Sequence, residues 1–411
     1  MSRAAIIGAG ISGLASARIL REKGYDVTIF EKEQTPGGLI RCDVVQGVLY
    51  HKVGGHVFNS KDKNVLDWFW HQMPDQQAFH KATRHAVVAL TDGVLPSYPI
   101  ENHLYQLPEP MCRQILHELL HISANGYGTP KNFDEFLRAR FGQTLYDVYF
   151  SPYNAKIWQS SLTDIPLDWL EGKLPMPTVE QILQANICRK PEQDMVHNTF
   201  NYPNQGGSQY IADTLAQGLD IRYSTPATQL ALREGRWSVN GENFDDVVYC
   251  ANIKHLPALL SGDASIDAWS TQVQSLRAHG TTSVLCQVDT NPFSWIYLPS
   301  RAYDAHRIIC TGNFSPTNAP AGFSTATIEF SGKKDKSEIL EQLELIPFLP
   351  RYLAHHYEPY TYPIQSGQTR QTVRAIKDYL QPKRMHLIGR FAEWEYYNMD
   401  AAIGAALHQL L

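Results

Sequence analysis

The chain has 411 residues, enough for one large hydrophobic core or two to three ordinary ones, so several lobes are expected. A hydrophobic fraction of 43% and a charged fraction of 19% are typical of a soluble globular protein, and a formal net charge of −5 argues against nucleic acid as the main partner. No apolar run approaches the length that spans a membrane, and the first predicted strand begins at residue 4, which leaves no room for a signal peptide.

The stretch 4–31 predicts a dinucleotide-binding unit. A short apolar strand runs into the sequence GAGISG, a helical segment follows, and a second strand-forming run ends at an acidic residue. Gly8 makes the tight turn, Gly10 lets backbone N–H groups approach a pyrophosphate, and Gly13 lets the helix pack closely on the strand. Glu31 then accepts hydrogen bonds from the ribose hydroxyls.

Two further glycine-rich loops follow soon after the first, TPGGL at Thr35 and GGHVF at Gly54. Each loop taken singly could be an ordinary β-turn. Together they are unusual for a nicotinamide dehydrogenase and suit a flavoprotein, in which the backbone passes close to the ribityl chain and the isoalloxazine ring. The expected cofactor is therefore FAD.

Hydrophobic periodicity divides the rest of the chain. A hairpin is predicted over 85–95, mainly helical structure over 103–200, antiparallel strands over 283–330, and a closing helix from about Met399. We expect an α/β fold with a Rossmann-like FAD-binding domain, an inserted helical lobe and an antiparallel β-sheet substrate domain. The expected boundaries are 1–82, 201–262 and 351–411 for the discontinuous FAD-binding domain, 103–200 for the helical lobe, and 83–102 with 263–350 for the sheet domain.

The six cysteines are scattered and form neither a C-x-x-C pair nor a metal-ligand spacing. We expect reduced, mostly buried thiols, no metal, and a cytoplasmic protein.

A set of motifs carries a resemblance that runs nearly end to end. They are GAGISGL, TPGGL, GGHVF, YPIEN, SPYNAKIW, FNYPNQGG, WIYLPSRAYDAHRIICTGNFSP and GRFAEWEYYNMDAAIGAA. On these motifs the chain resembles the flavin-dependent UDP-galactopyranose mutase family, especially its eukaryotic-type branch. The first two motifs belong to the wider amine-oxidase-like flavoprotein superfamily. PYN-x-K-x-W, the spacing from Tyr297 to Arg307 and GRF-x-x-W-x-Y-x-N are specific to the mutases.

The resemblance implies an FAD-dependent mutase that interconverts the pyranose and furanose forms of a nucleotide-diphosphate sugar for glycan assembly. In the family, reduced flavin N5 attacks the anomeric carbon and expels the nucleoside diphosphate, and the flavin-bound sugar opens as an iminium and recloses as the furanose. NADPH or NADH is a candidate external reductant. The protein must hold the diphosphate, stabilise it as a leaving group and exclude water.

The resemblance also implies a cationic cradle for the diphosphate. Arg307 matches the clamping arginine, whose planar guanidinium suits bidentate phosphate binding. Lys173 falls where the family carries a second clamp arginine, so the phosphate grip differs, another cation has taken over, or Lys173 is a solvated surface lysine. Tyr297, Tyr362 and Tyr396 match tyrosines whose hydroxyls contact the diphosphate, although any single tyrosine is more often a packing residue.

On the sugar side, the resemblance places Asn154 and Trp158 beside the sugar and gives Asn398 as the amide form of a position that holds Asp or Asn. Tyr98 and Glu101 align with a segment that binds uracil through a glutamine. An ionised glutamate offers acceptors only, which match the paired donors of a guanine edge. Either the nucleotide is not UDP, or Glu101 is a solvent-facing rim residue.

His56 lies in the loop that resembles the one facing the flavin ring, where the backbone rather than the imidazole accepts from N5, so it is a poor candidate for acid–base chemistry. Arg390 either serves the flavin or forms a structural salt bridge. The full set of expected FAD contacts is Gly8, Gly10, Ser12, Gly13, Glu31, Lys32, Gly38, Leu39, Gly54, Gly55, His56, Gly389, Arg390, Asn398 and Met399.

Two other functions remain open. The first is an FAD-dependent oxidoreductase of the amine oxidase or desaturase type, which shares the flavin motifs but needs no diphosphate clamp. The second is a flavin-binding protein without catalysis, for which the departure at Lys173 is the only indication.

Overall fold

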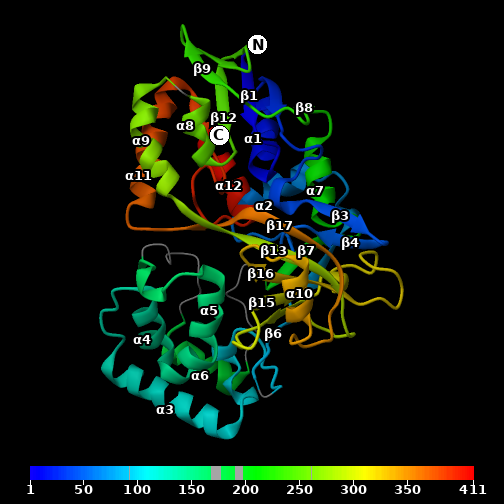
Figure 1. The fold of residues 1–411 in the computed structure, drawn as a ribbon, viewed down its shortest axis with the longest axis vertical. Coiled ribbons are helices and arrows are strands. Elements are labelled where there is room, and N and C mark those ends of the chain that lie inside the picture. The colour runs from blue at the N-terminus through cyan, green and yellow to red at the C-terminus, as the bar shows by residue number, and fades with distance from the viewer. Residues whose placement is uncertain (92, 168–176, 190–197, 261) are drawn as a thin grey trace.

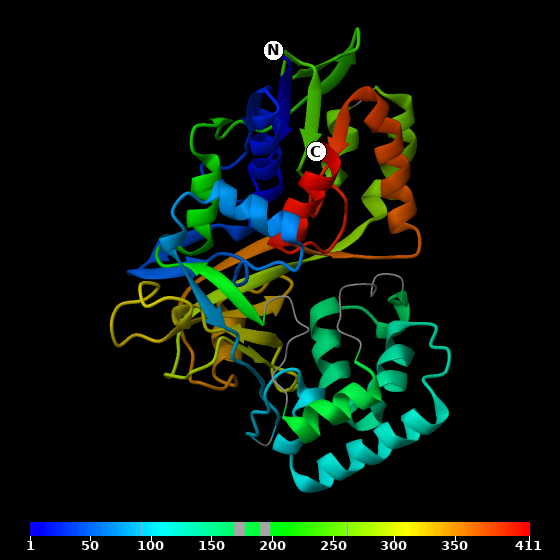
Figure 2. The ribbon, with the colours of Figure 1, turned by 180° about the vertical axis from the view of Figure 1, so that it is seen from behind.

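The computed structural model describes residues 1–91, 93–167, 177–189, 198–260 and 262–411. Within them the chain forms an α/β region at one end, a helical lobe at the other and a six-stranded sheet between them (Figure 1). Both chain ends lie in the α/β region (Figure 2). The expected fold class is confirmed, since a Rossmann-like parallel sheet, a helical lobe and separate antiparallel sheets are all present.

A five-stranded parallel sheet forms the centre of the α/β region. The chain leaves β1 toward β2 on one side and returns as β12 on the other, so a topological switch point lies at the carboxyl end of β1. The strand order is β18 (Met385–Leu387), β12 (Asp246–Tyr249), β1 (Arg3–Ile7), β2 (Asp26–Phe30) and β8 (Asp220–Arg222).

Both faces of this sheet are covered, which explains why β1 is continuously apolar after its first residue. Ala4 and Ile6 belong to one buried cluster, and Ala5 and Ile7 belong to the other. The first layer contains α1 (Ile11–Glu22), α2 (Lys63–Gln72), α7 (Gly207–Ala216) and α12 (Met399–Leu410). The second contains β9 (Leu230–Arg233), β10 (Arg236–Val239), β11 (Glu242–Phe244), α8 (Leu256–Leu259), α9 (Ala264–Ser275) and α11 (Thr369–Leu380).

The six-stranded sheet carries the expected substrate side. Its order is β17 (Arg351–Ile364), β13 (Arg277–Gln287), β16 (Thr325–Ser331), β15 (Ala305–Ile309), β14 (Trp295–Tyr297) and β6 (Ala86–Val88), with α10 (Lys336–Leu343) packed on it. All neighbours are antiparallel except β14 and β6, which are parallel. The strand β17 pairs with β13 and forms the outer strand of this sheet. The expected domain boundary at residue 350 therefore separates β17 from the sheet to which it is paired.

The hairpin predicted over 85–95 is present, with its return strand slightly later. Val88 N–H donates to the Pro96 carbonyl at 2.9 Å, and Leu90 N–H donates to the Val94 carbonyl at 3.0 Å. An antiparallel bridge between Val87 and Ser97 extends the pairing to the YPIEN motif.

The helical lobe contains α3 (Glu109–Asn125), α4 (Phe133–Leu145), α5 (Ser151–Trp158) and α6 (Val179–Cys188). A π-helical turn over Tyr146–Phe150 joins α4 to α5. The strands β5 (Phe79–Thr83) and β7 (Thr199–Pro203) pair antiparallel, which holds together the two ends of the segment containing this lobe. A second hairpin, β3 (Cys42–Val45) with β4 (Val48–His51), packs against the six-stranded sheet.

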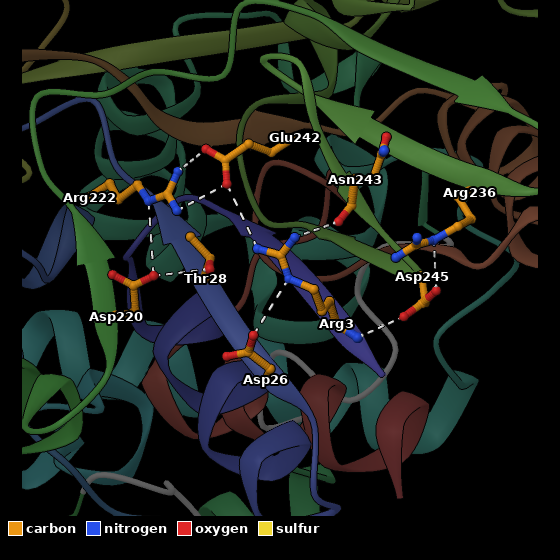
Figure 3. A network of polar contacts seen from close by, with 9 residues as sticks. All are labelled: Arg3, Asp26, Thr28, Asp220, Arg222, Arg236, Glu242, Asn243 and Asp245. Carbon is orange, nitrogen blue, oxygen red and sulfur yellow. Dashed lines mark hydrogen bonds and ion pairs between the residues drawn. The ribbon is translucent and has the colours of Figure 1, made fainter. Parts of the chain in front are cut away.

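A network of charged side chains closes the amino-terminal edge of the parallel sheet (Figure 3). Arg3 lies 3.5 Å from the Asp26 carboxylate and 3.8 Å from that of Glu242, and its main-chain N–H donates to Asp245 at 2.8 Å. Arg222 continues the network by pairing with Glu242. The opposite, carboxyl-terminal edge is therefore the one free to bind a ligand. Among the helices of the described ranges, none combines the length and the apolar character that crossing a bilayer requires.

Candidate functional site

A cavity of about 460 Å³ opens at the carboxyl ends of the parallel strands. Its walls come from the first glycine loop, the end of β2, the second glycine loop, the segment after β12, part of β17 and the start of α12. Segments far apart in the sequence meet here because the carboxyl ends of parallel strands share one edge of the sheet. The cavity therefore lies where a dinucleotide binds in folds of this class.

The glycine loops have the shape that a dinucleotide requires. Gly8 has φ +103°, and a Cβ at Gly13 would lie 1.9 Å from the Gly8 carbonyl oxygen, so α1 can approach β1 only with glycine at that position. The main-chain N–H of Gly37 donates to the Ala9 carbonyl at 2.8 Å, which fastens the second loop onto the first. A Cβ at Gly38 would lie 3.1 Å from the Gly10 Cα. The residues present fit FAD, since the bare backbone of both loops faces the cavity.

Glu31 lies at the end of β2 and is 6% exposed. Its Oε2 accepts from the Ala9 N–H at 2.6 Å, and its Oε1 accepts from the Glu33 N–H at 2.9 Å. Each carboxylate oxygen keeps a second lone pair. The side chain lines the cavity and is oriented to accept hydroxyl donors from a ligand.

Most of the expected FAD contacts line this cavity, and three do not. Gly54 and Gly55 lie instead against the six-stranded sheet, where a Cβ at Gly55 would be 2.5 Å from Ile309 Cγ2. Gly389 packs behind the first loop, with its Cβ position 2.6 Å from Ser12 Oγ. The predicted contacts that do line the cavity are Gly8, Gly10, Ser12, Gly13, Glu31, Lys32, Gly38, Leu39, His56, Arg390, Asn398 and Met399.

Sequence reasoning missed several lining residues. Cys250, Asn252 and His255 follow β12, and the rule that ligands bind beyond the carboxyl ends of parallel strands could have found them. Glu358 and Tyr360 belong to β17 of the other sheet, and no sequence motif marked that strand as passing the cavity.

His56 and Arg390 both line the cavity. Burial, with the Arg390 charge as a second cause, lowers the pKa of His56 to about 4, so the imidazole is neutral near pH 7. Its Nε2 has no hydrogen-bond partner among the described residues. Arg390 donates to the Tyr397 carbonyl at 3.0 Å and lies 4.3 Å from the Tyr396 ring centroid. Within the same described ranges Arg390 has no carboxylate partner, so its interpretation as a structural salt bridge finds no support.

Arg307 is held by a buried carboxylate beside the His56 loop. Its Nε donates to Glu329, which is 1% exposed, and its Nη2 donates to the Tyr362 hydroxyl at 3.1 Å. Burial alone would disfavour both charges, but their mutual attraction prevails, raising the pKa of Arg307 and lowering the pKa of Glu329. A Cβ at Gly54 would lie 3.4 Å from Glu329 Oε1 and 3.9 Å from an Arg307 nitrogen, so the Arg307 pair borders this loop.

Stacked tyrosines connect Arg307 to the cavity. The Tyr362 and Tyr396 rings stack at 5.5 Å, and Arg390, which lines the cavity, lies against the Tyr396 ring. The contact series Arg390, Tyr396, Tyr362, Arg307 therefore runs from the FAD cavity to the expected phosphate cation. Burial, partly offset by Arg307, raises the pKa of Tyr362 far above its ordinary value, so its hydroxyl keeps its proton.

A second arginine, Arg84, was not expected from the sequence. It donates to the Tyr297 hydroxyl, and its guanidinium carbon lies 4.6 Å from the Trp295 ring centroid and 5.7 Å from that of Tyr98. It makes no ion pair among the described residues, and its Nε has no hydrogen-bond partner there. Tyr297 is also the strand partner of Arg307. No motif contains Arg84, because it lies on the short link between β5 and β6.

The other expected substrate residues lie on the helical side. Trp158 Nε1 donates to Asn154 Oδ1 at 3.2 Å, so these two side chains form a pair on α5. Asn398 is the N-cap of α12 and lines the cavity. Lys173 lies outside the described residues.

The expected nucleobase segment is buried over 99–101 and half-buried at Tyr98. The Tyr98 and Tyr297 rings lie 4.4 Å apart between centroids. Glu101 is 7% exposed, so its interpretation as a solvent-facing rim residue is wrong. The main-chain carbonyl of Glu101 accepts from Asn186 on α6 at 2.8 Å, which holds the segment against the helical lobe.

Within the described ranges, no group of three or more His, Cys, Asp or Glu side chains is placed to hold a metal ion. All six cysteines are free thiols.

A family model described as an NAD(P)-binding Rossmann-like domain matches residues 6–72. A relative from Klebsiella pneumoniae named "Probable UDP-galactopyranose mutase" is 30% identical over 177 residues, 42% of this chain and 44% of that protein. The UDP-galactopyranose mutase of Mycoplasma pneumoniae is 22% identical over 98% of this chain and 94% of its own length. An Escherichia coli dTDP-fucopyranose mutase is 27% identical over 43% of this chain and 46% of that protein. The chain thus spans less than half of the first and third relatives and nearly all of the second.

Among solved structures, a reduced UDP-galactopyranose mutase superposes with a TM-score of 0.87 at 23% identity, over 100% of this chain and 95% of that one. A putrescine oxidase bound to putrescine superposes with a TM-score of 0.64 at 14% identity, over 100% of this chain and 98% of that one. At these identities the superpositions establish the shared fold.

Proposed function

We propose that this chain, a relative of the UDP-galactopyranose mutases over its full length, is a flavin-dependent mutase that interconverts the pyranose and furanose forms of a nucleotide-diphosphate sugar. One observation carries the proposal. Arg307, fixed by the buried Glu329, stands beside the loop that carries His56, and His56 lines the FAD cavity. An amine oxidase needs no such cation there, whereas the departure of a diphosphate requires one.

When bound between the two glycine loops and reduced, FAD would supply the nucleophile for displacing the nucleoside diphosphate at the anomeric carbon. Arg307 binds the phosphate oxygens, and its fixed fork stabilises the charge that develops as the diphosphate leaves. The same phosphate oxygens accept hydrogen bonds from the hydroxyl groups of Tyr297, Tyr362 and Tyr396. The raised pKa of Tyr362 keeps this donor protonated across the working pH range.

Arg84 supplies the second cation of the cradle. It donates to the Tyr297 hydroxyl and has no carboxylate partner among the described residues, so its charge is available to a second phosphate. This arrangement favours the alternative in which another cation has taken over from Lys173. Replacing Arg84 with alanine should raise the KM for the nucleotide sugar about tenfold or more, as expected when a charged hydrogen bond is lost.

Asn154, Trp158 and Asn398 are proposed to contact the sugar, and Tyr98 the nucleobase. The burial of Glu101 in the same segment favours a nucleotide other than UDP. Because the reaction has no net redox change, a reductant such as NADPH or NADH is needed only to prime the flavin.

The test uses purified holoenzyme, reduced anaerobically and offered UDP-, dTDP- and GDP-linked sugars, with products separated by ring form. We expect furanose product from the reduced protein and none from the oxidised protein. Arg307→Ala should lower kcat/KM by about 10²- to 10³-fold while FAD stays bound. Substrate-dependent oxygen uptake would instead identify an oxidoreductase, and no turnover across the panel would identify a flavin-binding protein without catalysis.

A further inference from the structure

Helix α5 of the helical lobe is tied to the strand pair that carries Arg307. The Lys156 ammonium nitrogen donates to the Leu298 carbonyl and to the Ala305 carbonyl, each at 2.8 Å. These carbonyls belong to opposite sides of the β14–β15 connection. One lysine therefore clasps both strands just beyond the pair formed by Tyr297 and Arg307.

The buried surroundings of the Lys156 side chain favour these two hydrogen bonds. Its nitrogen lies 4.7 Å from the Tyr303 ring centroid, and burial lowers its pKa to about 7. An amine keeps two N–H donors after losing one proton, so both carbonyls remain satisfied in either state. Without this side chain, both carbonyls would lose a buried donor.

The C-terminal end of α5 is fastened to the same sheet. Gln159, which caps the helix in the left-handed region with φ +45°, donates from Nε2 to the Ser331 carbonyl at the end of β16, at 2.9 Å. Arg277 of β13 donates to the Ser160 hydroxyl at 3.3 Å. The helix that carries Asn154 and Trp158 is thus held to the sheet at two places.

We propose that Lys156 is a positioning residue that sets the β14–β15 strand pair, and with it Tyr297 and Arg307, in register with the α5 side chains Asn154 and Trp158. This inference rests on the proposed function, because it explains how residues from two lobes form one substrate site. It adds to that function a residue that touches neither cofactor nor substrate. A displacement of about 1 Å in such a site costs up to about 10²-fold in rate.

The test compares Lys156→Met with wild type and with Lys334→Met as holoenzymes. Methionine keeps an unbranched apolar stem and removes the donor. Lys334 is the matched control, because it reaches the same connection through Asp304, at 2.6 Å, but donates to neither carbonyl. For Lys156→Met we expect faster amide hydrogen exchange over 298–306 and an unchanged flavin spectrum. We also expect the Kd to rise about tenfold for whichever of UDP, dTDP and GDP binds wild type most tightly. Lys334→Met should match wild type in all three.

The exchange measurement needs no turnover, so it separates this inference from the proposed function. If Lys156→Met leaves either the exchange over 298–306 or the affinity for that nucleoside diphosphate unchanged, the inference is overturned while the mutase assignment stands. If exchange accelerates but no sugar is turned over by wild type, the positioning role stands and the proposed function fails. Should Lys156→Met not fold, Lys156→Arg provides the same test. The guanidinium is larger than the ammonium group and its donors are fixed in one plane, so it must displace the connection to reach both carbonyls, and a smaller change in the same direction is expected.

Discussion

At the scale of single residues, the expected phosphate cation depends on a buried acid that no motif contains. Glu329 fixes the Arg307 guanidinium and also borders the glycine loop before His56. A bidentate arginine is useful only when its fork is held in one orientation, and Glu329 provides that constraint. The sequence presented Glu329 as one acid within a β-strand, so only the strand pairing of β15 with β16 revealed its role.

Glu101 gives a prediction at this scale. An ionised carboxylate offers acceptors only, so Glu101→Gln should shift the preference toward uridine sugars by about tenfold, the effect of one matched hydrogen bond. The measurement is the ratio of kcat/KM for UDP- and GDP-linked sugars in the two proteins. An unchanged ratio would show that Glu101 does not read the base.

At the scale of elements, the first glycine loop works because a helix can approach a strand closely there. Gly13→Ala would place a Cβ 1.9 Å from the Gly8 carbonyl oxygen, so α1 must move away from β1. We therefore expect protein purified without bound flavin, measured by visible absorbance per chain. The control is Gly367→Ala, whose Cβ would meet nothing within 4 Å. Equal flavin content in the two variants would contradict this account of the loop.

The amino-terminal edge of the parallel sheet gives a second prediction for elements. Arg3→Met removes the side chain that joins β1, β2 and β11 (Figure 3). Because these groups are partly exposed and screened, we expect a loss of only about 1 kcal/mol in the free energy of urea unfolding, with activity unchanged. Arg374→Met is the comparison, since Arg374 and Asp378 form an exposed pair within one helix. If both variants lose the same stability, the network adds nothing beyond isolated ion pairs.

At the scale of the whole molecule, buried histidines set a pH dependence of stability. His51 and His306 are both 0% exposed, and burial lowers their pKa values to about 3 and about 4. Between the ordinary value of 6.5 and these values, the unfolded chain binds more protons than the folded one. Stability should therefore fall as the pH drops from 6.5 toward 4, by up to about 1.4 kcal/mol per pH unit for each histidine.

Urea unfolding at several pH values measures this slope. His51→Gln should reduce the slope of unfolding free energy against pH by the contribution of one buried histidine. This expectation does not depend on how the substitution changes stability at pH 7. The exposed His71 provides the matched replacement, His71→Gln, which should leave the slope as it is. A slope that is the same in all three proteins would show that the buried imidazoles do not control acid stability.

The sequence by itself determined the α/β fold class and the dinucleotide loop. Its motifs also indicated a resemblance to the UDP-galactopyranose mutases, and most of the FAD contacts predicted from them line the cavity. These features are local, because glycine spacing and hydrophobic periodicity are dictated by backbone geometry over a few residues. Only the tertiary structure decided four other features. They are the outer position of β17, the ion pair of Arg307 with Glu329, the placement of the Arg84 cation beside Tyr297, and the hydrogen bonds from Lys156 to the β14–β15 connection. Each depends on strands or helices that lie far apart in the chain, and no local pattern fixes which of them pair.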